Sequence, residues 1–244
     1  TVSAGATMNV SGVARVMSIF SGKAGANHPL CELHAIGGDP DASNPKRHFF
    51  VSKTAMLKLS SIRLTGGRVV NVPTSGYADE GGSILVSGAF SSLIAFDVDF
   101  IGCSRTEPCA YEGGILIATE GATVSIVDST FRSSNAQGRG GAIYVSGETT
   151  YCSFRGTMFE NNTGTFGGAI FTRKLGSLLV DQSIFTGNSA RKNAGAIFLD
   201  MATEVMGVCS LTSTTFVQNE SPNGQGGAIY IKGKGCAISG STFS

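Results

Sequence analysis

The sequence lacks the features that mark several common classes of protein. Only 14% of its residues are charged, and 18 Lys and Arg balance 17 Asp and Glu, so no basic field exists to attract nucleic acid or an anionic membrane. No apolar run reaches the roughly 18 residues that a membrane-spanning helix needs. Neither a Cys-x-x-Cys pair nor a histidine cluster is present, so we predict no metal site and no cofactor. We therefore expect no nucleic-acid partner and no membrane insertion in this segment.

A helical pattern is also missing, because apolar residues at a 3.6-residue spacing never persist for more than a few residues. Glycine is abundant instead, at 34 of 244 residues, which suits stacked strands and turns better than helices. The chain begins at Thr1, without an initiator methionine or a signal peptide. We expect any targeting segment to be absent or already removed.

One motif recurs along most of the chain. It combines Gly-Gly-Ala-Ile with a later Phe and, three residues after that Phe, an Asn, as in residues 140–143 followed by Phe159 and Asn162. The isoleucines of the motif are Ile84, Ile115, Ile143, Ile170, Ile197 and Ile229. Their spacing of 27 to 32 residues is the period of a solenoid.

Each repeat contains three short segments whose apolar residues favour β-strands. They are the Gly-Gly-Ala-Ile segment, a segment beginning seven residues before the Phe, and a segment around the Phe. This pattern predicts an all-β fold, a right-handed parallel β-helix with three short strands per coil of 27 to 32 residues. The left-handed form needs strict six-residue repeats, which the sequence lacks.

The repeat also predicts the domain organisation. We expect residues 1–48 to form irregular coils with loops between them, and residues 49–244 to form regular coils of a single continuous domain. The sequence stops in mid-coil at Phe243 and Ser244, without the polar capping segment that solenoids carry at their ends. We therefore expect the solenoid to continue beyond it.

Cysteines occupy a defined place in the repeat. The residue seven before each Phe or Leu anchor is either aliphatic or Cys, and should form one inward-facing row: Leu57, Leu93, Val124, Cys152, Leu178, Cys209 and Cys236. Cys209 and Cys236 fall in adjacent coils, where stacked strands lie within disulfide range. A bridge or two buried thiols would both fit. Cys103 and Cys109 flank a short loop that a second bridge would close, whereas Cys31 has no obvious partner.

Asparagines recur three residues after the Phe. Asn162, Asn188 and Asn219 should stack at a bend and exchange amide hydrogen bonds along the axis. Three sequons begin at Asn9, Asn161 and Asn219, and in a eukaryotic host each is a plausible glycan site. Because Asn219 belongs to the ladder and Asn161 precedes it, we expect a glycan on Asn161 rather than on Asn219.

The Gly-Gly-Ala-Ile strand has apolar residues on both faces. Its second row, expected to face outward, is Leu85, Leu116, Tyr144, Phe171, Phe198 and Tyr230. Strands that are apolar on both faces are normally covered on both, and exposed apolar stripes usually mark an interface. We predict that other polypeptide chains, copies of this chain, or glycans cover this row. A solvent-exposed stacking ladder is the alternative.

The pairing of Gly-Gly-Ala-Ile with Phe-x-x-Asn resembles the polymorphic outer-membrane-protein repeat of chlamydial autotransporter passengers, and similar repeats occur in algal and protist surface proteins. The resemblance covers residues 49–243, with its best copies at Gly140–Ile143 and Gly167–Ile170. It departs from the pattern at Ala194, at Cys103 and throughout residues 1–48. What it implies is a passenger-type β-helix at a surface, often adhesive, without catalytic residues to transfer.

The function that these features favour is an extracellular or cell-surface structural or adhesive module, part of a larger surface protein or a filamentous appendage, and not an enzyme. The main alternative is a carbohydrate-active β-helix enzyme, for which paired carboxylates would be needed. Its candidate acids are Asp97, Asp99, Asp128, Glu160, Asp181 and Asp200. The histidines His28, His34 and His48 indicate no catalytic triad. An ice-binding protein is a third possibility, but the repeated Ser and Thr two residues before each Phe should face inward.

Overall fold

The computed structural model describes residues 8–11, 16–20, 31–34, 47–69, 81–103, 108–174, 176–201, 207–233 and 235–244. For residues 8–11, 31 and 34 only the backbone is described. The expected loops around Asn27 and at 39–46, together with His28, lie outside the described residues.

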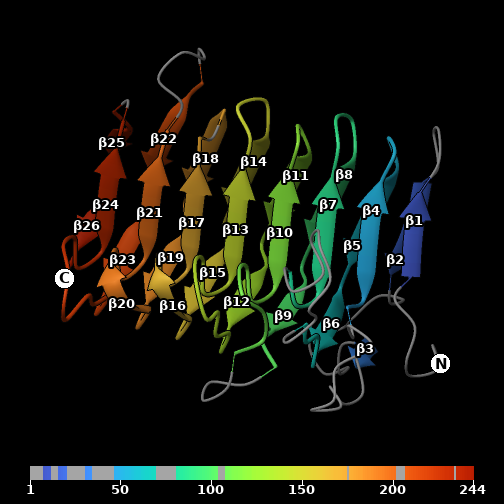
Figure 1. Cartoon of the computed structure of the whole chain (residues 1–244), viewed down its shortest axis with the longest axis horizontal. Coiled ribbons are helices and arrows are strands. Elements are labelled where there is room, and N and C mark those ends of the chain that lie inside the picture. Colours follow the sequence, from blue (N-terminus) through green and yellow to red (C-terminus); the bar gives the residue numbers. More distant parts are fainter. Residues whose placement is uncertain are drawn as a thin grey trace.

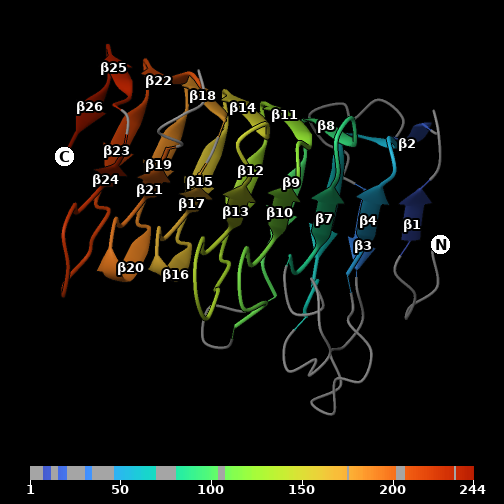
Figure 2. The ribbon, with the colours of Figure 1, turned by 45° about the horizontal axis from the view of Figure 1, so that its top comes forward.

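The fold is a parallel β-helix, as the repeat predicts (Figure 1). Three eight-stranded parallel sheets run side by side along the molecule, and each coil contributes one strand to each sheet. The described residues contain strands, turns and bends but no α-helix. Because neighbouring coils pair strand to strand, β1 and β24 lie at opposite ends of the long axis (Figures 1 and 2).

We name the three sheets A, B and C in the order in which a coil visits them. Sheet A contains β1 (Met8–Ser11), β4 (Phe49–Ser52), β7 (Ile84–Ser87), β10 (Leu116–Thr119), β13 (Ile143–Ser146), β17 (Ile170–Arg173), β21 (Ile197–Asp200) and β24 (Ile229–Lys232). Sheet B contains β2 (Val16–Phe20), β5 (Met56–Ser60), β8 (Ser92–Phe96), β11 (Thr123–Val127), β14 (Tyr151–Arg155), β18 (Ser177–Asp181), β22 (Cys209–Thr212) and β25 (Ala237–Ser239). Sheet C contains β3 (Cys31–His34), β6 (Ile62–Thr65), β9 (Asp99–Ile101), β12 (Thr130–Arg132), β15 (Met158–Glu160), β19 (Ile184–Thr186), β23 (Thr215–Val217) and β26 (Thr242–Phe243).

The first three strands show how the irregular beginning of the sequence joins the stack. β1, β2 and β3 pair in register with β4, β5 and β6, respectively. The described residues between Met8 and His34 therefore supply one strand to each sheet, and Met17 extends the inward row of sheet B that continues with Leu57. The described strands of this region therefore belong to the same stack, although the repeat is weak in its sequence.

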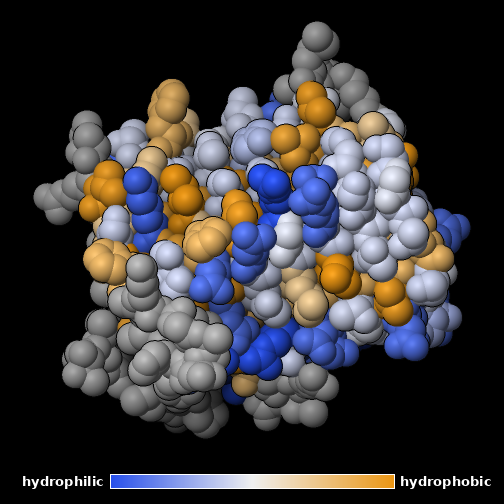
Figure 3. Space-filling model, turned by 180° about the vertical axis from the view of Figure 1, so that it is seen from behind, coloured by the Kyte–Doolittle hydropathy of each residue, from blue (hydrophilic) through white to orange (hydrophobic). Residues whose placement is uncertain are grey.

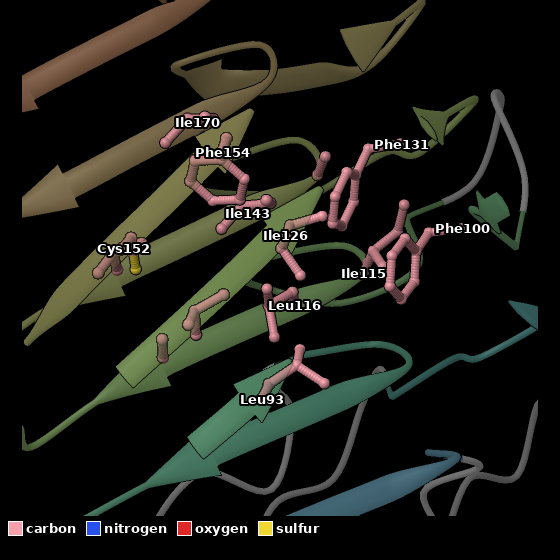
Figure 4. Close-up of a cluster of buried hydrophobic side chains, with 14 of the residues drawn as sticks. Leu93, Phe100, Ile115, Leu116, Ile126, Phe131, Ile143, Cys152, Phe154 and Ile170 are labelled. Carbon is pink, nitrogen blue, oxygen red and sulfur yellow. The ribbon is translucent and has the colours of Figure 1, made fainter. Parts of the chain in front are cut away.

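The core lies inside the coil and follows the predicted rows. Leu57, Leu93, Val124, Cys152 and Leu178 are fully buried and pair directly with one another along sheet B. Figure 4 shows Leu93 and Cys152 pointing into the interior together with the inward residues of sheets A and C. Fully burying an aliphatic side chain of this size contributes about 1.5–3 kcal/mol, so the rows supply most of the apolar burial.

The phenylalanine anchors stack inside sheet C. Consecutive ring centroids lie 4.4 to 5.2 Å apart, and all pairs are close to parallel. The stacked residues are Phe100, Phe131, Phe159, Phe185, Phe216 and Phe243. Figure 4 shows the rings of Phe100 and Phe131 facing each other. The repeated Phe therefore fixes both the interior and the register between coils.

Left-handed backbone conformations mark the corners. Between sheets B and C the residue three before each anchor has a positive φ in seven coils: Ser61, Asp97, Asp128, Gly156, Gln182, Ser213 and Gly240. The first glycine of the Gly-Gly motif also has a positive φ, as at Gly140 with 63°. Gly140 also lacks room for a side chain, because a Cβ on it would press against the carbonyl oxygen of Ile143.

We expect Gly140→Ala to lower the free energy of unfolding by roughly 2–3 kcal/mol, because the methyl group adds a clash to the cost of a positive φ. Urea denaturation followed by circular dichroism measures the change. Gly235→Ala is the control, because a Cβ at Gly235 meets nothing within 4 Å. Equal stabilities for the two variants would contradict the steric role of Gly140.

Candidate functional site

Two rows of polar side chains run through the interior and hold the coils in register. The asparagines of the motif form the first row. The amide oxygen of Asn188 accepts hydrogen bonds from the backbone N–H and the side-chain amide of Asn162, both at 3.0 Å. Asn219 receives the same two bonds from Asn188, at 3.1 and 2.9 Å. Each Nδ2 also donates to the carbonyl oxygen of a phenylalanine in the preceding coil.

Hydroxyl groups form the second row, two residues before each phenylalanine. Ser183 illustrates the geometry, because its Oγ accepts the backbone N–H of Thr157 at 3.1 Å and donates to the Asp181 carbonyl oxygen at 2.8 Å. Ser129, Thr157, Ser183 and Thr214 are all buried. These hydroxyls therefore lie inside the coil, as expected, and do not form an exposed ice-binding row.

The cysteines form two bridges. The Cys103–Cys109 disulfide has its Cα atoms 5.4 Å apart. The Cys209–Cys236 disulfide links adjacent coils, with its Cα atoms 4.6 Å apart. Cys152, in the inward row of sheet B, is a buried free thiol. Burial raises the pKa of that thiol. Only the backbone of Cys31 is described, in β3.

The structure corrects the outward row of sheet A. Leu116 pairs with Ile143 and faces the core, so Ile117, not Leu116, is the partner of Tyr144 in the outer row. The expected partner of Ile143, Ile115, lies one residue before β10. Three consecutive apolar residues at 115–117 conceal this register, because either alternation fits them.

The outer row is also covered differently from our prediction. Leu85, Ile117, Tyr144, Phe171 and Phe198 are at most 8% exposed and form a second apolar cluster. Tyr230, at the end of the row, packs against the cluster and is partly buried. This burial occurs within the single chain, so the row is neither a solvent-exposed ladder nor an open interface.

A short two-stranded sheet contributes to this cover. It consists of β16 (Thr163–Phe166) and β20 (Ser189–Asn193), which lie beside the start of β17 and β21 (Figures 1 and 2). Phe166 in β16 contacts Phe171 and Phe198 edge-on, with ring centroids 6.5 and 5.9 Å apart. Arg139 and Lys192 each lie 5.4 Å from a ring centroid, over Phe171 and Phe166 respectively, and strengthen the cover.

Burial and the nearby Glu112 carboxylate raise the pKa of Tyr144 in this cluster, although a hydrogen bond from Arg173 opposes the shift. Tyr144 is therefore a neutral phenol at physiological pH. Its role in the outer row is packing, with its ring 5.7 Å from that of Phe171 and parallel to it.

Four of the candidate acids meet at one place. Asp97, Asp99, Asp128 and Glu160 line a hollow of about 360 Å³ on the outer side of sheet C, together with Val98, Thr130, Arg132 and Met158. Asp181 and Asp200 lie outside this hollow. The Oδ2 of Asp181 is 3.8 Å from the Nε of Arg155, and the Oδ2 of Asp200 is 3.9 Å from the Nζ of Lys232. Figure 3 shows hydrophilic and hydrophobic residues interspersed on the face of the molecule that is seen from behind.

Asp99 bridges three coils within this hollow. It accepts hydrogen bonds from Arg63 at 2.9 Å and from Arg132 at 2.9 and 3.0 Å. Burial acts to raise the pKa of Asp99, but hydrogen bonds and charge from Arg132, and then from Arg63, outweigh it and hold the pKa below its usual value. Asp99 is therefore ionised and engaged, and cannot serve as a proton donor near neutral pH.

The lowered pKa predicts an acid-sensitive contribution to stability. Because the folded-state pKa lies below the unfolded value of about 3.9, the contribution is complete above that pH and is lost as the pH falls through the folded-state pKa. We expect Asp99→Asn to lower the free energy of unfolding by about 1 kcal/mol at pH 7, a modest value because both arginines are about one-third exposed.

Urea denaturation at pH 7 and at pH 2.5 tests this. The difference between wild type and Asp99→Asn should shrink at the lower pH. Asp128→Asn is the matched control, since Asp128 lines the same hollow but is exposed, and it should change little at either pH. A difference for Asp99→Asn that grows on acidification would contradict the assignment.

The sequons differ in their surroundings. Asn219 donates its Nδ2 to the Phe185 carbonyl oxygen at 2.8 Å and accepts two bonds through its Oδ1. Asn161 is half-buried, and its Nδ2 donates to the side chain of Glu160 at the surface of sheet C. The side chain of Asn9 is outside the described part of the chain.

After expression in a glycosylating eukaryotic host, we expect a glycan on Asn161 and none on Asn219, because a glycan on Asn219 Nδ2 would displace ladder hydrogen bonds. Mass spectrometry of proteolytic peptides, with and without enzymatic removal of N-glycans, measures occupancy at both. Occupancy of Asn219 with Asn161 bare would reverse the assignment.

Other candidate chemistry is sparse in the part of the chain that the structure describes. His48 is buried and its Nε2 lies 3.0 Å from the Leu33 carbonyl oxygen. The described residues include no group of three or more His, Cys, Asp or Glu side chains arranged to hold a metal ion. They also contain no helix long and apolar enough to cross a membrane.

Comparison with known proteins gives one result. The family model described as the Chlamydia polymorphic membrane protein (Chlamydia_PMP) repeat matches residues 156–173, 182–200 and 213–232. Each match begins before a Phe anchor and ends in the next strand of sheet A, so it joins two successive coils. No curated protein and no solved structure matches the chain.

The matched repeat and the solenoid fit each other and fit a surface, passenger-like module. The Gly, Phe and Asn positions that recur in this sequence form the tight corner, the ring stack and the amide ladder of the structure. The chain is thus a parallel β-solenoid with three segments that match the Chlamydia polymorphic membrane protein repeat.

Proposed function

We propose that this chain is a non-catalytic structural or adhesive module, displayed outside the cell as part of a larger surface protein or a filamentous appendage. The observation that carries the proposal is the polymorphic membrane protein repeat in three successive coils of an uninterrupted solenoid. A solenoid offers long lateral faces for binding, since each coil adds a similar strip to every sheet.

The interior favours a rigid scaffold. Ring stacks, amide and hydroxyl ladders and a bridge between coils all act along the same axis. Polar networks of this kind fix the register when every member is satisfied. A scaffold with a fixed register keeps its outer faces in constant relative positions, which suits multivalent contact with a surface.

The partners that we propose are other polypeptide chains, copies of this chain, or glycans. They would bind the outer faces of sheets B and C, where large apolar side chains are exposed. Phe96 and Ile94 are 50% and 39% exposed on β8, and Ile184 is 39% exposed on β19. Exposed apolar residues of this size favour contact with a partner when they lie close together.

A bead-binding experiment tests the adhesive role. Beads coated with the folded chain should attach to cultured epithelial cells, and the soluble folded chain should compete for attachment. Beads coated with heat-denatured chain at the same density are the control. Equal attachment of both kinds of beads would contradict an adhesive role that depends on the fold.

The carbohydrate-active alternative rests on the hollow that contains Asp97, Asp99, Asp128 and Glu160. Its weakness is that Asp99 is committed to two arginines. Polygalacturonate and hyaluronan are suitable probes, with release of reducing ends as the readout. Turnover that disappears in Asp97→Asn and Asp128→Asn would establish the enzyme and overturn the non-catalytic proposal.

A further inference from the structure

The outer face of sheet C carries exposed apolar side chains beside the hollow. Met158 and Ile184 pair directly on β15 and β19, and they are 36% and 39% exposed. Both strands have a paired strand on either side, so this exposure belongs to the sheet face and not to an end of the stack. Met158 also lines the hollow. The apolar pair and the hollow therefore form one continuous surface.

Two carboxylates lie on the other side of this surface, at the corner between sheets B and C. Asp97 and Asp128 both have a positive φ, of 54° and 47°, a conformation that Asp adopts more readily than most residues. Gly156 leaves room for the second carboxylate, because a Cβ on it would occupy the place of the Asp128 Oδ1. Among the described residues, neither of these two corner carboxylates has an ion-pair partner.

The charges of the surface do not balance. The four carboxylates of the hollow face two arginines, Arg63 and Arg132, and both of these bind Asp99. Arg155, the next cation along the corner, lies 3.8 Å from Asp181, so that pair adds no net charge. The surface keeps an excess of negative charge, which is concentrated at the corner carboxylates next to exposed apolar side chains.

We propose that this surface binds a basic amphipathic segment of a partner polypeptide in an extended conformation. Its cationic side chains pair with the corner carboxylates, and its apolar side chains pack on Met158 and Ile184. This inference rests on the proposed function, since it assigns a partner of stated chemistry to the outer face of sheet C. Among the partners proposed above, a polypeptide supplies both cationic and aliphatic side chains, which the charge and the apolar pair require.

The spacing suits an extended segment. Asp97, Asp128, Met158 and Ile184 come from four successive coils, so they span about 14 Å along the stack. Side chains on one face of an extended segment are about 6.8 Å apart. Three such side chains cover the surface, with cations at the Asp97 end and an apolar residue at the Ile184 end.

Fluorescence anisotropy of the intact chain with a labelled peptide, Lys-Ser-Lys-Ser-Leu-Ser-Leu, tests the proposal. We expect it to bind about 10-fold more tightly than a peptide with Ser in place of both leucines, and than one with Glu in place of both lysines. The affinity should fall as salt is added. Equal affinity for the peptide without leucines would reduce the effect to charge alone and overturn the proposal, as would no binding.

One pair of double variants locates the charge. Asp97→Asn with Asp128→Asn should weaken binding of the Lys-Leu peptide by about 10-fold. Glu120→Gln with Glu148→Gln is the matched control, because it removes as much charge from exposed residues at the corners between sheets A and B. Equal losses in the two double variants would show that net charge, rather than this surface, attracts the peptide.

A second comparison tests the apolar pair. Met158→Ser with Ile184→Ser should weaken binding about 5-fold or more, whereas Phe90→Ser, which removes an 82% exposed ring between sheets A and B, should leave it unchanged. Circular dichroism verifies the fold of each variant. Unchanged binding in the first variant would overturn the proposal.

The peptide experiment uses no cells, so its result is separable from that of the bead experiment. Peptide binding that depends on the corner carboxylates, together with no attachment of beads to cells, would contradict the adhesive role and support this surface. Attachment of beads without peptide binding would overturn the present inference alone.

Discussion

Leu178→Asp is expected to abolish the native stack around its coil. The Leu178 side chain is fully buried between Cys152 and Cys209, so the change removes apolar burial and places a carboxylate where no cation lies opposite. Together these effects cost about 5 kcal/mol or more, which is comparable with the whole stability of many domains. Since each coil contacts only its neighbours, failure of one coil separates those on either side.

Leu179→Asp provides the matched control on the same strand. Leu179 points outward, is half-buried, and has the serines Ser153 and Ser210 beside it. Its replacement should change the free energy of unfolding far less, by about 1 kcal/mol at most. Urea denaturation and limited proteolysis measure both variants. A Leu178→Asp protein as stable as the control would show that the inward row is assigned to the wrong face.

Asn188→Ala should have the second-largest effect, because Asn188 is the middle member of the amide ladder. The substitution removes the acceptor for the backbone N–H and Nδ2 of Asn162 and the donor to the Phe159 carbonyl oxygen. Asn162 and Asn188 are both fully buried, and each buried polar group left unsatisfied costs about 1–3 kcal/mol. We expect a loss of about 3–5 kcal/mol in the free energy of unfolding.

Asn161→Gly tests whether the position in the ladder, rather than the residue type, carries this effect. Asn161 has a positive φ of 53°, and the corresponding place in the next coil is Gly187 with a φ of 61°. Glycine accepts this conformation without strain, so the variant should stay within about 0.5 kcal/mol of wild type. Thermal denaturation measures the stability of both variants. Comparable losses of stability in Asn161→Gly and Asn188→Ala would contradict the role of the ladder.

Much of the fold could be predicted because the signals repeat. Phe159 lies seven residues after Cys152, and Phe185 lies seven residues after Leu178. A fixed step of this kind aligns sheets B and C without further information. The parallel stack and the inward row follow from that alignment together with the strand spacing, which also places Cys209 and Cys236 within disulfide range but does not decide between a bridge and two thiols.

The covering of sheet A could not be predicted in the same way. Phe166 packs against the outer row, and its signal in the sequence is a large aromatic residue directly before the Gly167-Gly168 corner. β20 contains Arg191, Lys192 and Asn193, which do not resemble a typical strand. Their pairing with β16 depends on neighbouring coils, and tertiary contacts of this kind leave no local pattern.

The same limit applies to the hollow on sheet C. The sequence indicates that Asp97 and Asp128 occupy equivalent places in successive coils. It also aligns Arg63 with Asp99 as direct partners. It does not indicate that Arg132 reaches Asp99, because Arg132 pairs directly with Ile101 and contacts Asp99 diagonally. Side-chain reach across strands, rather than alignment, decides the chemistry of this hollow.

The constant step between sheets B and C has a consequence for how such a chain can change over evolutionary time. Every anchor from Leu64 to Phe243 lies seven residues after its partner in sheet B, whereas the segments that lead into and out of sheet A differ in length from coil to coil. Insertions and deletions should therefore accumulate along two of the three edges only. Sequence diversity, and with it recognition by antibodies, would be concentrated on those edges while the third stays uniform.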